Sequence, residues 1–278
     1  MITSSLSTTH SESVSTSLLY NRWAATYDTD RNPLQILDSA LIPSLLNTLF
    51  SLPSKTQNGA VVTELGCGTA RNTIRLLTSP LSKNIVSVHA LDLSPAMLEI
   101  ARSRCTPFIF DNDSPGPIIH FNEFNALNPQ KNPNLSKLIQ GKANIIISTL
   151  VLEHLPLSSF FSAINFLLKP DSEGNNGRVL ITNMHAEMGR LSQAGFVDEV
   201  EGKKTKIRGE SYVYEIEEVV GEGKKWAFEV VGEVLERMIE EEDVEEHGNG
   251  LRLGSRGKKW IGKRMWFGMV MERRAEWN

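Results

Sequence analysis

Cysteine and long apolar runs are both scarce in this chain of 278 residues. The two cysteines, Cys67 and Cys105, provide neither a disulfide framework nor the paired spacing of a zinc site. No apolar run approaches the roughly 20 residues of a membrane-spanning helix. The first residues lack the basic start and apolar segment of a signal peptide. We therefore expect a cytoplasmic protein that has no membrane partner.

A surplus of positive charge is also missing. The chain has 29 Lys and Arg residues against 33 Asp and Glu residues, which gives a net charge of −4. Such a balance does not indicate a general electrostatic attraction to nucleic acid. The length and the 40% hydrophobic content suffice for one large domain. We expect a monomer or homodimer without a nucleic-acid partner.

Two common nucleotide-binding fingerprints are absent from the glycine-containing stretch 60–71. Arg71 occupies the place of the third glycine in G-x-G-x-x-G, and no G-x-x-x-x-G-K-[ST] sequence is present. What remains is an apolar run, a turn containing Gly66 and Gly68, a helix-length interval, and a second apolar run that ends at Asp92. This order predicts a βαβ unit with a ligand loop after its first strand.

The residues around this loop form an ordered set of motifs. Residues 64–70 fit E/D-x-G-x-G-x-G/A, residues 92–98 fit D-x-S-x-x-M-L, and residues 152–155 read LEHL. Across about residues 20–185 the chain therefore resembles the class I S-adenosylmethionine-dependent methyltransferases. Its LEHL segment and residues 183–188 are also similar to fungal methyltransferases of small-molecule pathways.

The resemblance implies an α/β fold, a doubly wound seven-stranded sheet that is mostly parallel, with the last strand antiparallel. We expect residues 1–17, rich in Ser and Thr, to be a disordered tail. Residues 18–278 then form a single methyltransferase domain with an N-terminal helical lid over 18–50, in which Pro43 marks a kink or break. A hairpin insertion at about 190–210 is expected to cover the substrate.

The cofactor that the resemblance implies is S-adenosylmethionine. Glu64 suits its zwitterionic amino-acid group, Asp92 its ribose hydroxyls, and Asn125 its adenine edge. Two residues have alternative roles. Tyr27 either covers the sulfonium of the cofactor or only packs its own helix against the domain. Arg71 either binds the carboxylate of the cofactor or is a solvated surface residue. The other residues expected to bind the cofactor are Gly66, Cys67, Gly68, Leu93, Met97, Ala126, Ser148 and Leu150.

A base is needed only where the methyl acceptor must lose a proton. His154 and His185 are the candidates, because imidazole titrates near neutral pH, although His154 can equally have a structural role. We expect no metal. The favoured function is methyl transfer to an O or N atom of a small molecule. A peptide or protein methyltransferase, or a cofactor-binding protein that does not methylate, such as a pericyclase, remains an alternative.

Overall fold

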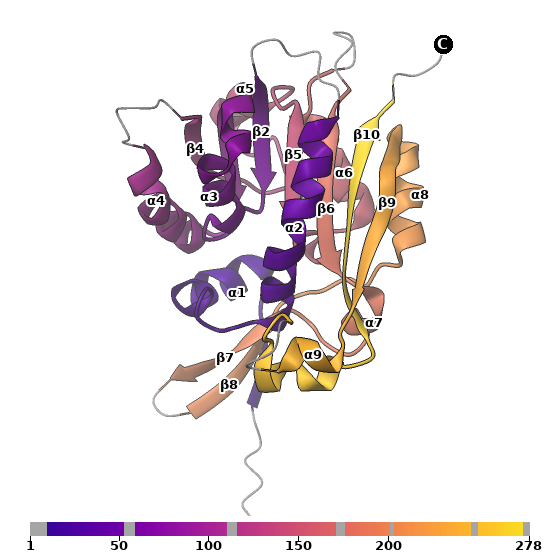
Figure 1. Ribbon diagram of the computed structural model, residues 1–278. Helices are drawn as coiled ribbons and strands as arrows, with labels where there is room; N and C mark the ends of the chain where they lie inside the picture. The colour runs from indigo at the N-terminus through magenta and orange to yellow at the C-terminus, as the bar shows by residue number, and fades with distance from the viewer. Residues whose placement is uncertain are drawn as a thin grey trace, which may run out of the picture.

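Seven strands form the central sheet of the molecule. The computed structural model describes residues 10–52, 59–109, 116–170, 176–200, 203–245 and 250–274. The strand order is β4-β3-β2-β5-β6-β10-β9 (Figure 1). The strands are β2 (Ala60–Leu65), β3 (Ile85–Asp92), β4 (Ile118–Glu123), β5 (Ile145–Thr149), β6 (Arg178–Met184), β9 (Phe228–Met238) and β10 (Arg264–Arg273). Among these seven strands, β10 alone runs opposite to the other six, so the predicted fold is confirmed.

Both faces of this sheet are buried. Ile145 and Ile147 of β5 belong to one apolar cluster, whereas Ile146 between them belongs to the other. The first face is covered by α2 (Pro33–Ser51), α3 (Arg71–Thr78) and α4 (Pro95–Ile109), and the second by α5 (Pro133–Ile139), α6 (Leu157–Leu167) and α8 (Ile216–Lys225). A strand buried on both sides favours apolar residues at successive positions, which explains the three consecutive isoleucines at residues 145–147 of β5.

Helix α2 continues through Pro43, so the break that the sequence suggests there does not occur. Proline has no N–H group and leaves the carbonyl four residues earlier without its helical partner. That carbonyl belongs to Ser39, and it accepts a hydrogen bond of 3.0 Å from Arg75 Nη2 of α3. A side chain of the neighbouring helix therefore replaces the missing donor.

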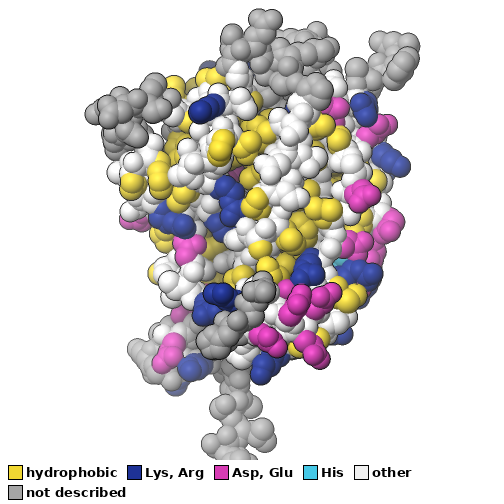
Figure 2. Space-filling model, in the orientation of Figure 1, with side chains coloured by type: hydrophobic (Ala, Val, Ile, Leu, Met, Phe, Trp, Pro, Cys, Tyr) yellow, Lys and Arg dark blue, Asp and Glu magenta, His cyan; other side chains and the backbone are white. Residues whose placement is uncertain are grey.

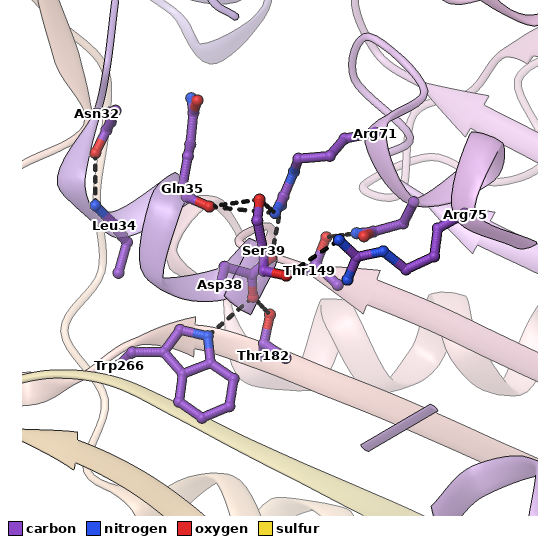
Figure 3. A network of polar contacts seen from close by, with 11 residues as sticks. Asn32, Leu34, Gln35, Asp38, Ser39, Arg71, Arg75, Thr149, Thr182 and Trp266 are labelled. Carbon is purple, nitrogen blue, oxygen red and sulfur yellow. Dashed lines mark hydrogen bonds and ion pairs between the residues drawn. The ribbon is translucent and has the colours of Figure 1, made fainter. Parts of the chain in front are cut away.

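A buried carboxylate, Asp38, fixes α2 on the sheet (Figure 3). It is fully buried, and Oδ1 accepts hydrogen bonds from Thr182 Oγ1 of β6 at 2.5 Å and from Trp266 Nε1 of β10 at 2.9 Å. Oδ2 lies 2.5 Å from Arg71 Nη2, at the start of α3. One side chain thus joins two helices and two strands.

The N-terminal segment forms part of a second, smaller sheet. Strand β1 (His10–Ser13) pairs in parallel with β8 (Lys203–Arg208), which pairs antiparallel with β7 (Gly195–Val200). The expected disorder is therefore wrong for residues 10–17, which form β1 and the start of α1 (Thr16–Trp23). Residues 1–9 lie outside the described residues. Strands β7 and β8 pair as a hairpin within the predicted range 190–210, and residues 201–202 at its turn are not described.

Helix α1 and the small sheet lie beyond the carboxyl ends of the central strands, below the arrowhead of β2 in Figure 1. The short helices α7 (Ala186–Gly189) and α9 (Glu241–Val244) lie at the same end. Figure 2 shows acidic and basic side chains mixed over the α9 region. Within the described ranges, no helix is both long and apolar enough to span a membrane.

Replacing Asp38 with Ala should lower the free energy of unfolding by about 3–5 kcal/mol, because Arg71 then loses its buried counter-ion. Denaturant titration followed by circular dichroism measures this loss. Glu229, whose partner Arg274 is exposed, supplies the control, since Glu229→Gln should leave the unfolding midpoint unchanged. An Asp38→Ala protein as stable as the parent would contradict the structural role of this carboxylate.

Candidate active site

The loop after β2 contains two glycines with different surroundings. Gly66 has a φ of +77°, and a Cβ atom there would lie 2.2 Å from Cγ2 of Val151. Gly68 has a φ of +52°, and nothing lies within 4 Å of the place where its Cβ would be. The first glycine therefore allows the loop after β5 to pack against this turn, whereas the second leaves room beside the backbone.

Asp92, at the end of β3, holds this loop in place. Its Oδ2 accepts the Gly68 N–H at 2.7 Å, and its Oδ1 accepts the Ser94 N–H at 2.8 Å. Burial raises the pKa of the Asp92 carboxyl, although these N–H groups oppose the increase. With the Leu93 N–H, three backbone donors face the carboxylate, which has about four lone-pair sites and so can accept a further donor such as a ribose hydroxyl.

Glu64 is buried in the same region, at the end of β2. Its side chain is 1% exposed, and Thr73 of α3 donates its hydroxyl to Oε2. Burial raises the pKa of Glu64 to about 8, despite the hydrogen bond from Thr73 and the positive charge of Arg71. The charge of Asp92 also contributes to this increase, so the two carboxylates are close enough to interact.

Arg71 is held by α2 rather than solvated. Besides its ion pair with Asp38, Nη1 donates to Ser39 Oγ at 2.7 Å. Burial alone lowers the pKa of Arg71, but the charges of Asp38, Tyr27 and Glu64 and the hydrogen bond to Asp38 together outweigh this effect, and the net change is upward. The guanidinium is therefore permanently charged, and its predicted contact to a cofactor carboxylate stays a prediction.

The lid expected over residues 18–50 begins with an aromatic cluster on α1 and the turn after it. Trp23 lies edge-on to Tyr27, with ring centroids 5.0 Å apart, and stacks on Phe196 of β7 at 5.4 Å. Asn21 Oδ1 accepts a 2.6 Å hydrogen bond from Ser94 Oγ, at the start of α4. Burial raises the pKa of Tyr27. The positive charge of Arg71 opposes this increase, and the negative charge of Asp92 adds to it. The lid is thus docked on both the hairpin and the βαβ unit.

A cavity of about 350 Å³ lies beneath this lid. Its wall is built from α1, the first turn of α2, the loop after β5, the end of β6, α7, the hairpin and residues 255–260. Tyr20 and Tyr27 come from the lid, and Leu150 and Glu153 from the loop after β5. Glu153 is 4% exposed, and burial raises the pKa of its carboxyl. The cavity therefore combines aromatic faces with one buried carboxyl group.

His154, a predicted base, lies behind Tyr20 and is not part of the cavity wall that the described residues form. Its Nδ1 is 3.0 Å from the Glu210 carbonyl oxygen, which can only accept a hydrogen bond. Nδ1 therefore carries the ring hydrogen. Nε2 accepts the hydroxyl of Tyr20, which lies 2.7 Å away. The structure thus connects His154 to the cavity through a tyrosine.

His185, the other predicted base, has a different position. Its Nδ1 accepts the Glu187 N–H at 3.1 Å and so caps α7, while its Nε2 lies 3.3 Å from Glu236 Oε2 of β9. It does not line the cavity that the described residues form. These contacts give His185 a capping role and leave both ring nitrogens occupied.

The remaining predicted cofactor residues follow the carboxyl ends of β2 to β5. Met97 and Cys67 are buried, and Ser148 Oγ is buried without a hydrogen-bond partner. Asn125 Oδ1 accepts the Leu127 N–H at 2.9 Å and forms a local turn. Leu93 is half-buried, Leu150 has a positive φ, and Ala126 packs against the cluster on the second face. Among the described residues, no group of His, Cys, Asp or Glu is arranged to hold a metal ion.

Sequence reasoning missed Tyr20 and Asp38 as parts of the site. Tyr20 lies within the lid predicted over residues 18–50, but no motif distinguishes it there. Asp38 shares a helix face with Ile42, Leu45 and Leu49, all of which are buried. A charged residue on an apolar helix face indicates a buried polar contact, and this signal could have identified Asp38.

Comparisons with known proteins agree with this geometry. A family model described as a methyltransferase domain matches residues 63–173. An uncharacterized methyltransferase of Emericella nidulans is 38% identical over 276 residues, which cover 93% of this chain and 91% of that protein.

Solved structures share the fold at low sequence identity. Magnesium protoporphyrin IX methyltransferase from Synechocystis PCC 6803 is 14% identical, with a TM-score of 0.54 over 92% of this chain and 94% of that one. Geranyl diphosphate C-methyltransferase from Streptomyces coelicolor A3(2) is 15% identical, with a TM-score of 0.55 over 86% and 77% of the two chains. Given these matches and the loop geometry after β2 and β3, the chain belongs to the class I S-adenosylmethionine-dependent methyltransferases.

Proposed function

We propose that this protein methylates an O or N atom of a small molecule that binds in the cavity under the lid. The observation that carries this proposal is the position and size of that cavity. It has a volume of about 350 Å³, which is within the usual range for small-molecule sites. Its wall includes Leu150 and Glu153, next to the carboxyl ends of β2 and β5, where open α/β sheets bind their ligands.

The residues at these strand ends fit S-adenosylmethionine. Gly68 has open space beside its Cα, Asp92 has free lone pairs, and Ser148 Oγ lacks a hydrogen-bond partner. We infer that Asp92 binds the ribose and Glu64 the ammonium group, while Tyr27 covers the sulfonium end. Bound there, S-adenosylmethionine supplies a methyl group that its positive sulfur already activates.

The chain itself then has two tasks. The aromatic lid and the hairpin exclude water, and the cavity wall holds the acceptor atom in line with the methyl group. Glu153 lies at the wall in a buried position, where a carboxyl group of raised pKa can accept a hydrogen bond from the acceptor's O–H or N–H. Alignment in a dry cavity is the main contribution expected from the protein.

A peptide or protein acceptor is the weaker alternative, because an extended chain needs an open groove. Here Trp23 stacks on Phe196 and closes the space between α1 and the hairpin. A cofactor-binding protein without methyl transfer, such as a pericyclase, would give a product of unchanged mass. Incubation with cofactor labelled in its methyl group and a fractionated extract, followed by mass spectrometry, separates these alternatives. A labelled small molecule supports the proposal, and label found only in peptides contradicts it.

Asp92→Ala should weaken the binding of S-adenosylhomocysteine at least a hundredfold, about 2.7 kcal/mol. The variant removes the acceptor for the ribose hydroxyls and also releases the Gly68 loop. Isothermal titration calorimetry measures the affinity. Glu123 ends the neighbouring strand β4 and is exposed, so Glu123→Ala is the matched control and should bind normally. If the unmodified protein does not bind S-adenosylhomocysteine, the proposed function fails.

The raised pKa of Glu64 predicts that the protein releases a proton when it binds S-adenosylhomocysteine. With a pKa of about 8, this carboxyl is mostly protonated at pH 7 in the free protein, whereas a bound ammonium group favours the charged carboxylate. Binding at pH 7 should therefore release close to one proton, and the release should vanish by pH 9, where Glu64 is already ionised. Calorimetry in buffers of different ionisation enthalpy counts these protons. Glu64→Gln should abolish the release at pH 7, and an unchanged release would contradict this role.

A further inference from the structure

Tyr20 lies between the cavity and His154. Its side chain lines the cavity, and its hydroxyl donates to His154 Nε2 over 2.7 Å. In the neutral ring, the Glu210 carbonyl oxygen selects the tautomer with hydrogen on Nδ1 of His154, so Nε2 accepts the Tyr20 hydroxyl. The Tyr20 oxygen therefore keeps its lone pairs for a second donor. A hydroxyl group inside the cavity is placed to be that donor.

Two carboxyl groups interact with the ring of His154. Oε1 of Glu153 lies 4.0 Å from Nε2, and His154 interacts with the half-buried Asp92 as well. Burial raises the pKa of both carboxyls, and a positive His154 opposes this increase in each. The other groups that face this pair are the hydroxyls of Tyr20 and Tyr27, both of which remain neutral. An imidazolium formed here would thus have two carboxylates beside it.

The charges of the cavity wall disfavour a cationic acceptor. Besides Glu153, the wall contains Arg256 and Lys259. Arg256 is paired with Asp30 at 2.8 Å. Lys259 lies over the ring of Trp260, 4.6 Å from its centre, and has no carboxylate partner among the described residues. Burial, the charge of Arg208 and the charge of Lys259 lower the pKa of Lys206, on β8, so Lys259 and Lys206 are neighbours. The wall therefore has two exposed cations against one buried carboxyl group, a balance that favours a neutral acceptor over an ammonium group.

The cavity also offers aromatic faces. Tyr20, Trp23, Tyr27 and Trp260 all contribute to its wall, and a flat ring packs well against such side chains. A phenol combines the required properties, because it is planar and neutral, and its single acidic proton is lost as the oxygen becomes a nucleophile.

We propose that the acceptor is a phenolic compound and that Tyr20 and His154 together remove its proton, an inference that rests on the proposed function. The phenol O–H bond breaks as its proton moves to the Tyr20 oxygen, and the hydroxyl proton of Tyr20 moves to His154 Nε2. The phenolate oxygen forms the new bond to the methyl group, whose former bonding pair stays on sulfur. The products are a methyl ether, a neutral thioether and an imidazolium, so charge and atoms balance. Tyr20 is the catalytic residue, and His154 receives the proton through it.

The test uses 4-nitrophenol, whose ionised form absorbs visible light, with the full chain saturated by S-adenosylhomocysteine. The bound probe should ionise with an apparent pKa at least one unit below that of the free probe, a tenfold shift. Tyr20→Phe keeps the ring but removes the hydroxyl, and His154→Gln removes the final proton acceptor, so each should abolish the shift. Tyr212 is 40% exposed and stacks on Tyr214, which makes Tyr212→Phe the matched control that keeps the shift.

A second measurement does not depend on the probe. Nitrogen NMR of the free protein labelled in its histidines should show His154 with hydrogen on Nδ1 and a bare Nε2, the signal being assigned by its loss in His154→Gln. A hydrogen on Nε2 would overturn the proposal, as would an unshifted or upward-shifted pKa of bound 4-nitrophenol. Failure of 4-nitrophenol to bind at millimolar concentration, or tighter binding of 4-nitrobenzylamine, would overturn the acceptor class. In each case normal S-adenosylhomocysteine binding leaves the proposed function intact, whereas its absence defeats the proposed function itself.

Discussion

The carboxylate of Asp38 is the contact on which the arrangement of the site depends. A fully buried charge is costly unless its partners surround it, and Asp38 finds them on β6, β10 and α3. These partners fix the rotation of α2 about its axis. The first turn of α2 then supplies Leu34 and Gln35 to the cavity wall, while Arg71 begins the helix that follows the glycine loop. One carboxylate therefore positions both the acceptor cavity and the loop beside it.

The central sheet could be predicted from the sequence because its signals are local. The glycine turn after β2, the aspartate that ends β3 and the apolar run of β5 each lie within a few consecutive residues. The reversed strand β10 also agreed with the family pattern. Asp38 and Trp266 are 228 residues apart, and no local pattern relates them. Their pairing follows from how the finished sheet places β10 next to β6, which only the three-dimensional structure reveals.

Strand β1 and His185 illustrate two further limits of prediction from the sequence. The Ser- and Thr-rich composition of the first residues predicts disorder, yet His10–Ser13 pairs with β8 through backbone groups, which composition does not encode. His185 has the residue type of a base, but its place directly before a short helix makes it a cap. His154 has the same chemistry and reaches the cavity only because α1 folds back and places Tyr20 against it. Residue type predicts what a side chain can do, whereas its hydrogen-bond partners decide which of these roles is available.

A continuous set of hydrogen bonds connects the lid to the glycine loop. The Gly68 N–H binds one oxygen of Asp92, the Ser94 N–H binds the other, and Ser94 Oγ donates to Asn21 of α1. The contacts of Arg22 with Glu12 and Asp198 are partly exposed and contribute little to holding the lid. Helix α1, the start of the predicted lid, is held by the stacking of Trp23 on Phe196 and by this partly buried set of hydrogen bonds. The position of the lid and that of the loop therefore depend on the same aspartate, so a change at Asp92 affects both the cofactor side and the closed side of the cavity.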